Sequence, residues 1–225
     1  MRKKIIISII LLIYGIQGFA QIKPFRFGFK VAPNIAWISP DSKTYKSDGS
    51  VIGFSWGFLA DFTLTENYFV KTGFNMDYHS GKLEYPHTIP PDTGTMHRKY
   101  NLRYLQIPLT LKMRTNKFGK FAYFGEIGFG TSFNLRAKSK DEFIYNNGQN
   151  TYDTEDIKDE IVFMKESIIL GIGIEYFVDE STSIIAELTF NHGISNVLKG
   201  ENTADPNIKQ KGFLYYFELN IGVMF

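Results

Sequence analysis

The chain has 225 residues, no cysteine, and 25 Lys and Arg against 23 Asp and Glu, a formal net charge of +2 at pH 7. The absence of cysteine excludes disulfide bonds and thiolate chemistry, and the near balance of charge gives no indication of a nucleic-acid partner. Bulky and very small side chains are both frequent, with 21 Phe, 13 Tyr and 20 Gly.

Residues 1–20 have the pattern of a secretory signal peptide. Basic residues open the segment, an apolar run follows, and the small residues Gly18 and Ala20 precede a cleavage site before Gln21. The alternative is a membrane anchor, but the apolar run is shorter than the roughly 20 residues that a spanning helix needs. We expect cleavage, which leaves one domain at 21–225 with 22 basic and 23 acidic residues and a net charge of −1.

Eight segments of this domain carry apolar residues at every second position, the period of a β-strand with one apolar face. Long and short connections between them alternate, as in outer-membrane barrels with short periplasmic turns and long external loops. The pattern predicts an all-β, eight-stranded antiparallel up-and-down transmembrane barrel. The segments are 25–37, 51–64, 68–79, 100–114, 120–137, 166–178, 182–193 and 212–225.

The alternation alone does not say which face of the barrel is inside. A soluble barrel of the lipocalin type would bury the apolar face and expose the polar one. Here the apolar stripes consist of Phe, Tyr, Trp, Ile and Leu, which are too bulky to share the lumen of an eight-stranded barrel. The opposite face is rich in Gly, Ser, Thr and Asn, so we expect the apolar stripes to face lipid in the outer membrane of a Gram-negative bacterium.

Twelve charged residues fall on the expected inner face, six basic and six acidic. Unpaired buried charges are costly, so equal numbers favour ion pairs that fill the lumen. The alternative is an acid–base or proton-handling cluster of the four glutamates, but no nucleophile motif accompanies them. The twelve are Arg26, Lys30, Lys71, Lys112, Arg114, Arg136, Asp61, Asp77, Glu126, Glu175, Glu187 and Glu218.

Two long polar segments, 80–99 and 138–165, are expected to be external loops that can meet a protein partner. His79, His87 and His97 lie in or beside the first, at spacings that match no metal-site template. The second is acidic but lacks the residue pattern of a calcium loop. We therefore expect no catalytic residue, no metal and no cofactor.

The chain ends in a strand whose outward residues are all apolar or aromatic. A soluble protein seldom leaves such a strand as an edge, because the edge invites aggregation. The pattern resembles the C-terminal signal that outer-membrane barrels show to the barrel-assembly machinery. The expected partners are thus membrane lipid and that machinery. The signal residues are Tyr215, Phe217, Leu219, Ile221, Val223 and Phe225.

Residues 104–112, YLQIPLTLK, resemble the Y-L-x-I-P-L-x-L-K strand of the PorT-like outer-membrane barrel family of Bacteroidota. Weaker matches are AQ at 20–21, FGFK at 27–30, GFLADF at 57–62 and HGISNV at 192–197. The resemblance implies a small eight-stranded barrel and, through the namesake of the family, a link to type IX secretion and gliding. It marks a fold rather than an activity and carries over no functional residue.

Three functions remain open from the sequence. The first is a non-enzymatic barrel with a structural or interaction role, with a link to type IX secretion as its more specific form. The second is a narrow porin-like channel for ions or small solutes, although eight strands leave little aqueous path. The third is a small outer-membrane enzyme. The only residues that favour it are His79 and Asp77, near one rim. We favour the first.

Overall fold

The computed structural model describes residues 24–225 except 43, 147 and 203–208. The expected signal peptide and its cleavage site lie outside the described residues. No helix in the described part of the chain is long and apolar enough to cross a membrane.

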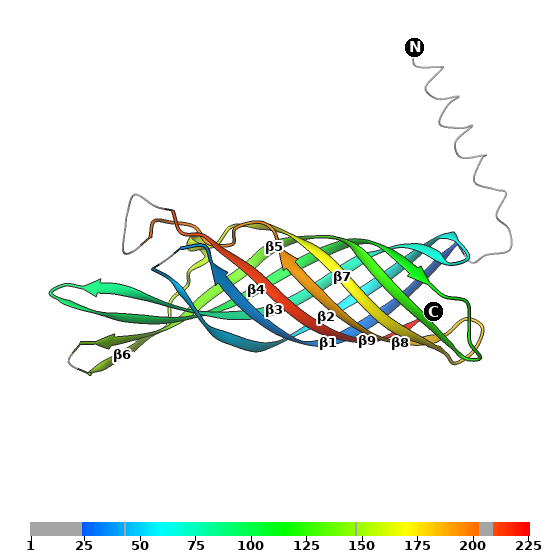
Figure 1. The fold of residues 1–225 in the computed structure, drawn as a ribbon, viewed down its shortest axis with the longest axis horizontal. Coiled ribbons are helices and arrows are strands. Elements are labelled where there is room, and N and C mark those ends of the chain that lie inside the picture. The colour runs from blue at the N-terminus through cyan, green and yellow to red at the C-terminus, as the bar shows by residue number, and fades with distance from the viewer. Residues whose placement is uncertain (1–23, 43, 147, 203–208) are drawn as a thin grey trace, which may run out of the picture.

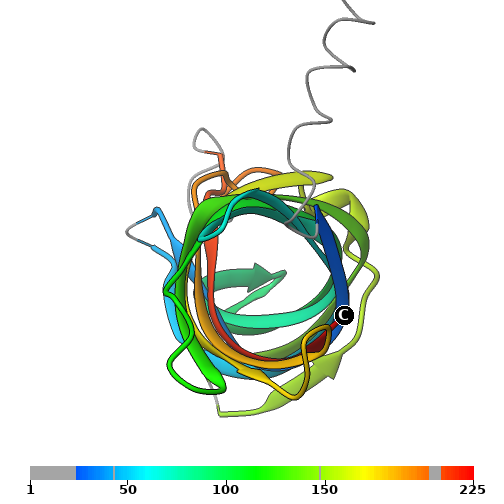
Figure 2. The same ribbon diagram turned by 90° about the vertical axis from the view of Figure 1, so that its right-hand side faces the viewer.

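The described chain forms a closed antiparallel ring of eight strands, as the alternation predicts (Figure 1). Each strand pairs with its neighbour along the chain, and the first pairs with the last, so the sheet closes on itself (Figure 2). A short strand, β6 (Asn150–Asp153), adds to the outer end of β5, and a 3-10 helix covers Lys158–Glu160. The ring strands are β1 (Phe25–Pro40), β2 (Lys46–Thr65), β3 (Tyr68–Ile89), β4 (Asp92–Arg114), β5 (Phe121–Tyr145), β7 (Met164–Phe177), β8 (Ser183–Gly193) and β9 (Gly212–Met224).

The apolar stripe of every ring strand faces outwards. In β1, exposed and buried residues alternate one by one, from the half-exposed ring of Phe29 to the buried amide of Asn34. Ile172 in β7 is 69% exposed although it is wholly apolar. A continuous band of such residues is stable against lipid and unstable against water, which excludes the soluble barrel with a buried apolar face.

The two ends of the barrel differ. At the end where β1 begins and the chain terminates, short turns join β2 to β3, β4 to β5 and β7 to β8 (Figure 1). At the other end, β3, β4, β5 and β6 project as two paired extensions. In an outer-membrane barrel the short turns are periplasmic, so the extensions lie outside the cell.

Residues 80–99 and much of 138–165 are therefore not the loops that their polarity suggests. β3 and β4 stay paired as far as Ile89 and Asp92, and β5 continues to Tyr145. The physical reason is that most polar residues of these segments lie on the outward side. Their inward residues, such as Leu83 and Phe143, are buried against one another.

A β-bulge at Leu135 changes which residues of β5 point inwards. Arg103 pairs with Arg136 and Tyr104 pairs with Asn134, which leaves Leu135 without a partner on β4. A bulge shifts the alternation of inward and outward residues by one position. Beyond Leu135, residues of β5 that would have pointed inwards therefore point outwards, and the reverse. Ala137 is buried and Arg136 is exposed, so the prediction that Arg136 points into the lumen is wrong.

The outer half of the lumen is filled by a hydrophobic core rich in tyrosine. Tyr100, Tyr104 and Tyr216 are each at most 2% exposed and belong to one buried cluster that continues into the extensions. The connections after β5 and β8 complete the wall there, where Ile161 forms a bridge to Leu198 and both side chains join the core. The inner half of the lumen is polar and holds the charged residues.

Candidate functional site

Glu175 of β7 is the centre of the charge cluster nearest the periplasmic end. Its carboxylate lies 2.6 Å from a guanidinium nitrogen of Arg26 and 3.2 Å from one of Arg114. The ammonium of Lys112 lies 3.9 Å from the same carboxylate and 2.9 Å from that of Asp61. Three cations from β1 and β4 thus surround two carboxylates from β2 and β7, across the full width of the lumen.

A second cluster of charges lies next to the first, one level closer to the external end of the barrel. Lys71 of β3 donates to Glu126 of β5 and to Glu187 of β8, each at 2.8 Å. A Cβ at Gly171 of β7 would lie 2.6 Å from the Glu126 side chain and 2.9 Å from that of Glu187. Glycine at that position therefore makes room for two carboxylates to reach one ammonium. Beside them Lys30 binds Glu218 at 2.5 Å.

The third level, below the tyrosine core, includes a residue of segment 138–165, which the sequence predicts to be an external loop. Lys165 is fully buried, and its ammonium lies 5.0 Å from the ring centre of Tyr104 and 5.4 Å from that of Tyr216. His79 lies inside the barrel rather than on the rim, with Nε2 at 3.6 Å from Asp77. Lys165 is in the same alternation as Glu175, so counting back along β7 would have found it.

The structure thus brings eleven of the twelve predicted charges into the lumen and places Arg136 outside. With Lys165 in its place, the described lumen again holds six cations and six anions. The cavity between Lys71, Glu126, Glu187 and Glu218 measures about 20 Å³, room for about one water molecule. Side chains pack this lumen, and its carboxylates face cations rather than an open cleft.

Above the membrane, Arg98 joins the extensions to the wall. Its guanidinium donates two hydrogen bonds to Asp141, at 2.9 and 2.6 Å, and a third to Glu160 at 2.7 Å. Burial holds the pKa of Tyr85 well above the usual value for tyrosine, so it stays neutral near this arginine. Burial, followed by the charge of Arg98, lowers the pKa of His87.

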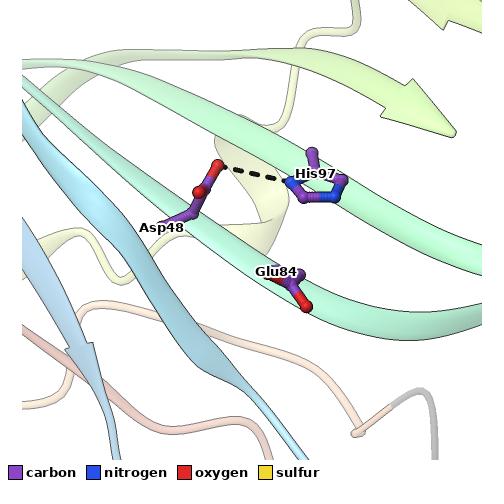
Figure 3. Close-up of side chains that lie close together, drawn as sticks. All are labelled: Asp48, Glu84 and His97. Atoms are coloured by element: carbon purple, nitrogen blue, oxygen red, sulfur yellow. Dashed lines mark hydrogen bonds and ion pairs between the residues drawn. The ribbon is translucent and has the colours of Figure 1, made fainter. Parts of the chain in front are cut away.

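Three residues on the outside of the extension could offer ligands to a metal (Figure 3). Within the described residues, Asp48, Glu84 and His97 place one ligand atom each within 4.8 Å of one another, and Nδ1 of His97 is 3.4 Å from Asp48. Asp48 reaches the group through an irregularity in the pairing of β2 with β3. All three are half-exposed, and Lys82 and Lys99 line the cavity that Asp48 and His97 share. The positive charges of these two lysines disfavour the binding of a metal ion, so we assign no metal site here.

Five of the six residues of the expected C-terminal signal lie on the outer face of β9, and Phe225 directly follows the strand. Of the six, five are exposed and Tyr215 is half-buried between Trp37 and His192. The last strand pairs with β1 on one side and β8 on the other, so it is the strand that closes the ring.

An apolar outer band, a packed charged interior and turns that are short at one end define a transmembrane β-barrel of the outer-membrane type. Residues 19–199 match the family described as outer membrane protein beta-barrel domain, and the chain belongs to this family. It is a protein of the Gram-negative outer membrane. The match is to the broad family and does not single out its PorT-like relatives.

A solved structure supports the same fold. The chain is similar to Neisserial surface protein A (NspA), at 13% identity and a TM-score of 0.52, over 90% of this chain and 96% of that one. It also matches the outer membrane protein OprG from Pseudomonas aeruginosa, at 9% identity and a TM-score of 0.48, over 89% and 95% of the two chains. No curated protein matches the chain in sequence.

Proposed function

We propose that this protein is a non-enzymatic outer-membrane barrel whose extensions form a rigid binding surface for a protein partner outside the cell. The observation that carries the proposal is the continuation of β3, β4 and β5 beyond the apolar band as paired strands. Buried side chains such as Leu83, Tyr85 and Phe143 hold them together. Because the strands are already ordered, a partner that binds them has little conformational entropy to remove.

The extensions carry exposed apolar side chains at their ends. Ile89 ends β3 at the tip of the β3–β4 hairpin, and Tyr152 in β6 is 70% exposed. Aromatic side chains of this kind often supply most of the energy of a protein interface. The packed lumen supports the same reading, since it leaves no obvious path for a solute and no open cleft for a substrate.

The more specific form of the proposal is a role linked to type IX secretion. Its support is the resemblance of residues 104–112, which form the membrane part of β4, to the PorT-like strand. In this form the partner is a component of the secretion or gliding machinery. Residues 104–112 themselves form part of the barrel wall and do not contact the partner.

Shortening one extension tests the proposal. Tyr85 and Met96 face each other across the hairpin, so residues 86–95 can be replaced by Asn-Gly, which favours a two-residue turn. We expect normal insertion, seen as heat-modifiable migration in a gel, together with loss of the partner in cross-linking from Tyr152. Secretion of type IX cargo should fall as well.

The matched control is a two-residue insertion in the periplasmic turn at Lys117, which leaves the outer surface intact. Unchanged cross-linking and envelope integrity after the shortening would contradict the binding role. A lost partner with unchanged secretion would instead contradict only the secretion link.

A further inference from the structure

The bulge at Leu135 has a second effect, because it places cations on the lipid-facing side of the barrel. Outwards from Arg103 and Arg136, the outer face of β3, β4 and β5 carries six basic residues, which we name the basic ladder. They are Lys82, Lys99, Arg103, Arg136, Lys138 and Lys140.

Like charges stand opposite each other in the basic ladder. Arg103 pairs with Arg136, and Lys99 pairs with Lys82 on one side and with Lys140 on the other. Directly opposed residues on antiparallel strands have Cβ atoms about 4.5–5.5 Å apart, at which like charges destabilise the sheet. Within the described residues no carboxylate forms an ion pair with any of the six side chains. An arrangement that costs stability in this way points to an anionic ligand.

Of the carboxylates near the basic ladder, Glu84 and Asp156 form no ion pair within the described residues, and three others have partners elsewhere. Asp141 is held by Arg98, and Asp48 lies against His97. Glu142 accepts hydrogen bonds from Asn150 and from the hydroxyl of Tyr152. The positive charge of the basic ladder is therefore open to an external group.

The position of the basic ladder in the membrane identifies the kind of ligand. At the next outward-facing pair towards the periplasm the wall is apolar, with Leu105 opposite Phe133. From Arg103 to Lys99 is four residues, about 14 Å along a strand and about 10 Å along the membrane normal at the usual tilt. That range covers the headgroup layer at the edge of the hydrocarbon core, on the external side.

The surface there is also hollowed. A cavity of about 360 Å³ is lined by Tyr78, Arg103, Arg136, Lys138 and Lys140 among others. The Arg103 guanidinium lies 4.7 Å from the ring centre of Tyr78, and its Nε has no hydrogen-bond partner within the described residues. A planar guanidinium held on an aromatic ring suits a phosphate oxygen.

We propose that the basic ladder binds the phosphate groups of an outer-leaflet glycolipid, of the lipid A type. Guanidinium and ammonium groups of β4 and β5 neutralise the phosphates, while the apolar band below contacts the acyl chains. This site borders the protein-binding surface of the proposed function, because Tyr152 lines one cavity with Lys82, Lys99 and Lys140. Its dependence on lipid phosphate can nevertheless fail independently of the protein contact. The site fixes the depth and rotation of the barrel in the asymmetric membrane.

The test is lipid retention by native mass spectrometry of the refolded full barrel with diphosphoryl lipid A. The variant is Lys99→Gln/Arg136→Gln/Lys140→Gln, and the control is Lys158→Gln/Lys199→Gln/Lys211→Gln, which removes the same charge from the same side of the membrane. At about fivefold per cation near an anionic surface, the first variant should lose affinity about a hundredfold. The control should bind like the wild type.

Two arms use the wild-type protein alone, so the proposal stays open to test if a variant does not fold. Lipid A without phosphates should bind far more weakly, and inorganic phosphate in large excess should not displace diphosphoryl lipid A. Equal retention of dephosphorylated lipid A, or equal binding by both variants, would overturn the assignment. Displacement by inorganic phosphate would also overturn it, because the ligand would then be a soluble anion.

Discussion

At the residue scale, the lumen shows how charge can be buried in a narrow barrel. Glu175 and Lys71 each face two or more opposite charges from different strands. A buried ion pair adds little net stability over a well-packed apolar pair. Removing one partner, however, leaves the other as an unpaired buried charge. The clusters therefore tie distant strands into one register, and single changes in them are costly.

Glu175→Gln tests this view. The change leaves Arg26, Lys112 and Arg114 with only the carboxylate of Asp61 among the residues of their cluster. We expect the free energy of unfolding to fall by about 3–5 kcal/mol. Urea titration of the barrel in lipid vesicles, followed by tryptophan fluorescence, measures it.

The control for this change is Glu180→Gln in the exposed turn after β7, which should shift the free energy of unfolding by less than about 0.5 kcal/mol. A similar small shift for Glu175→Gln would mean that the cluster contributes nothing to holding the strands together.

Residue patterns predicted most of these charges but not their contacts. Every second position of a strand points the same way, so Lys30, Asp61 and Glu218 could be placed inside without knowing their neighbours. That Lys30 meets Glu218, 188 residues away along the chain, depends on the closure of β1 onto β9. Short-range alternation contains no information about which distant strand lies opposite.

At the element scale, the bulge in β5 decides more than its one residue suggests. It turns Arg136 towards the lipid headgroups and Asp141 towards Arg98, so one irregularity supplies both the basic ladder and the anchor of the extension. No glycine or proline marks Leu135. The bulge follows from the pairing of two long strands, and only the assembled sheet reveals it.

The turn between β7 and β8 makes a prediction about pH. Asp179 accepts hydrogen bonds from the backbone amides of Ser181 and Thr182, at 2.7 and 2.8 Å. These bonds, that of Ser181 first, lower the pKa of Asp179 to about 2. Because the folded pKa lies below the unfolded one, the bonds stabilise the turn above about pH 4 and are lost as the pH falls through 2.

NMR of the barrel in micelles measures this effect. The Asp179 carboxyl should titrate near pH 2, and hydrogen-exchange protection of the Ser181 and Thr182 amides should fall over the same range. In Asp179→Asn the protection of these amides should lose its pH dependence. A midpoint near 4 for Asp179 would show that the turn bonds do not form in solution.

At the scale of the whole molecule, two layers fill the barrel. Charged clusters occupy the periplasmic half, and a core around Tyr100, Tyr104 and Tyr216 occupies the external half. The sheet has no free edge within the membrane, and the outer band meets lipid. The barrel is thus a closed support that carries two extensions out of the membrane.

The wild-type barrel in planar bilayers should therefore show no steady conductance. The cavity of about 20 Å³ among the charged residues holds about one water molecule, which is no continuous aqueous path. Tyr100→Ala/Tyr104→Ala/Tyr216→Ala should also fail to conduct, because the ion-paired layer remains. Reproducible single-channel steps from the wild type would instead support the porin-like alternative.

The sequence by itself determined the eight strands, their alternating connections, the outward apolar face and the near balance of charge inside. These properties depend on side chains one or two positions apart, and hydrophobic periodicity reports them directly. The tertiary structure alone decided that β3, β4 and β5 continue outside the membrane and that Leu135 forms a bulge. It also decided that Arg136 lies outside the lumen and Lys165 inside it. Those features depend on hydrogen bonds between strands far apart in the chain, whose register is set only when the ring closes.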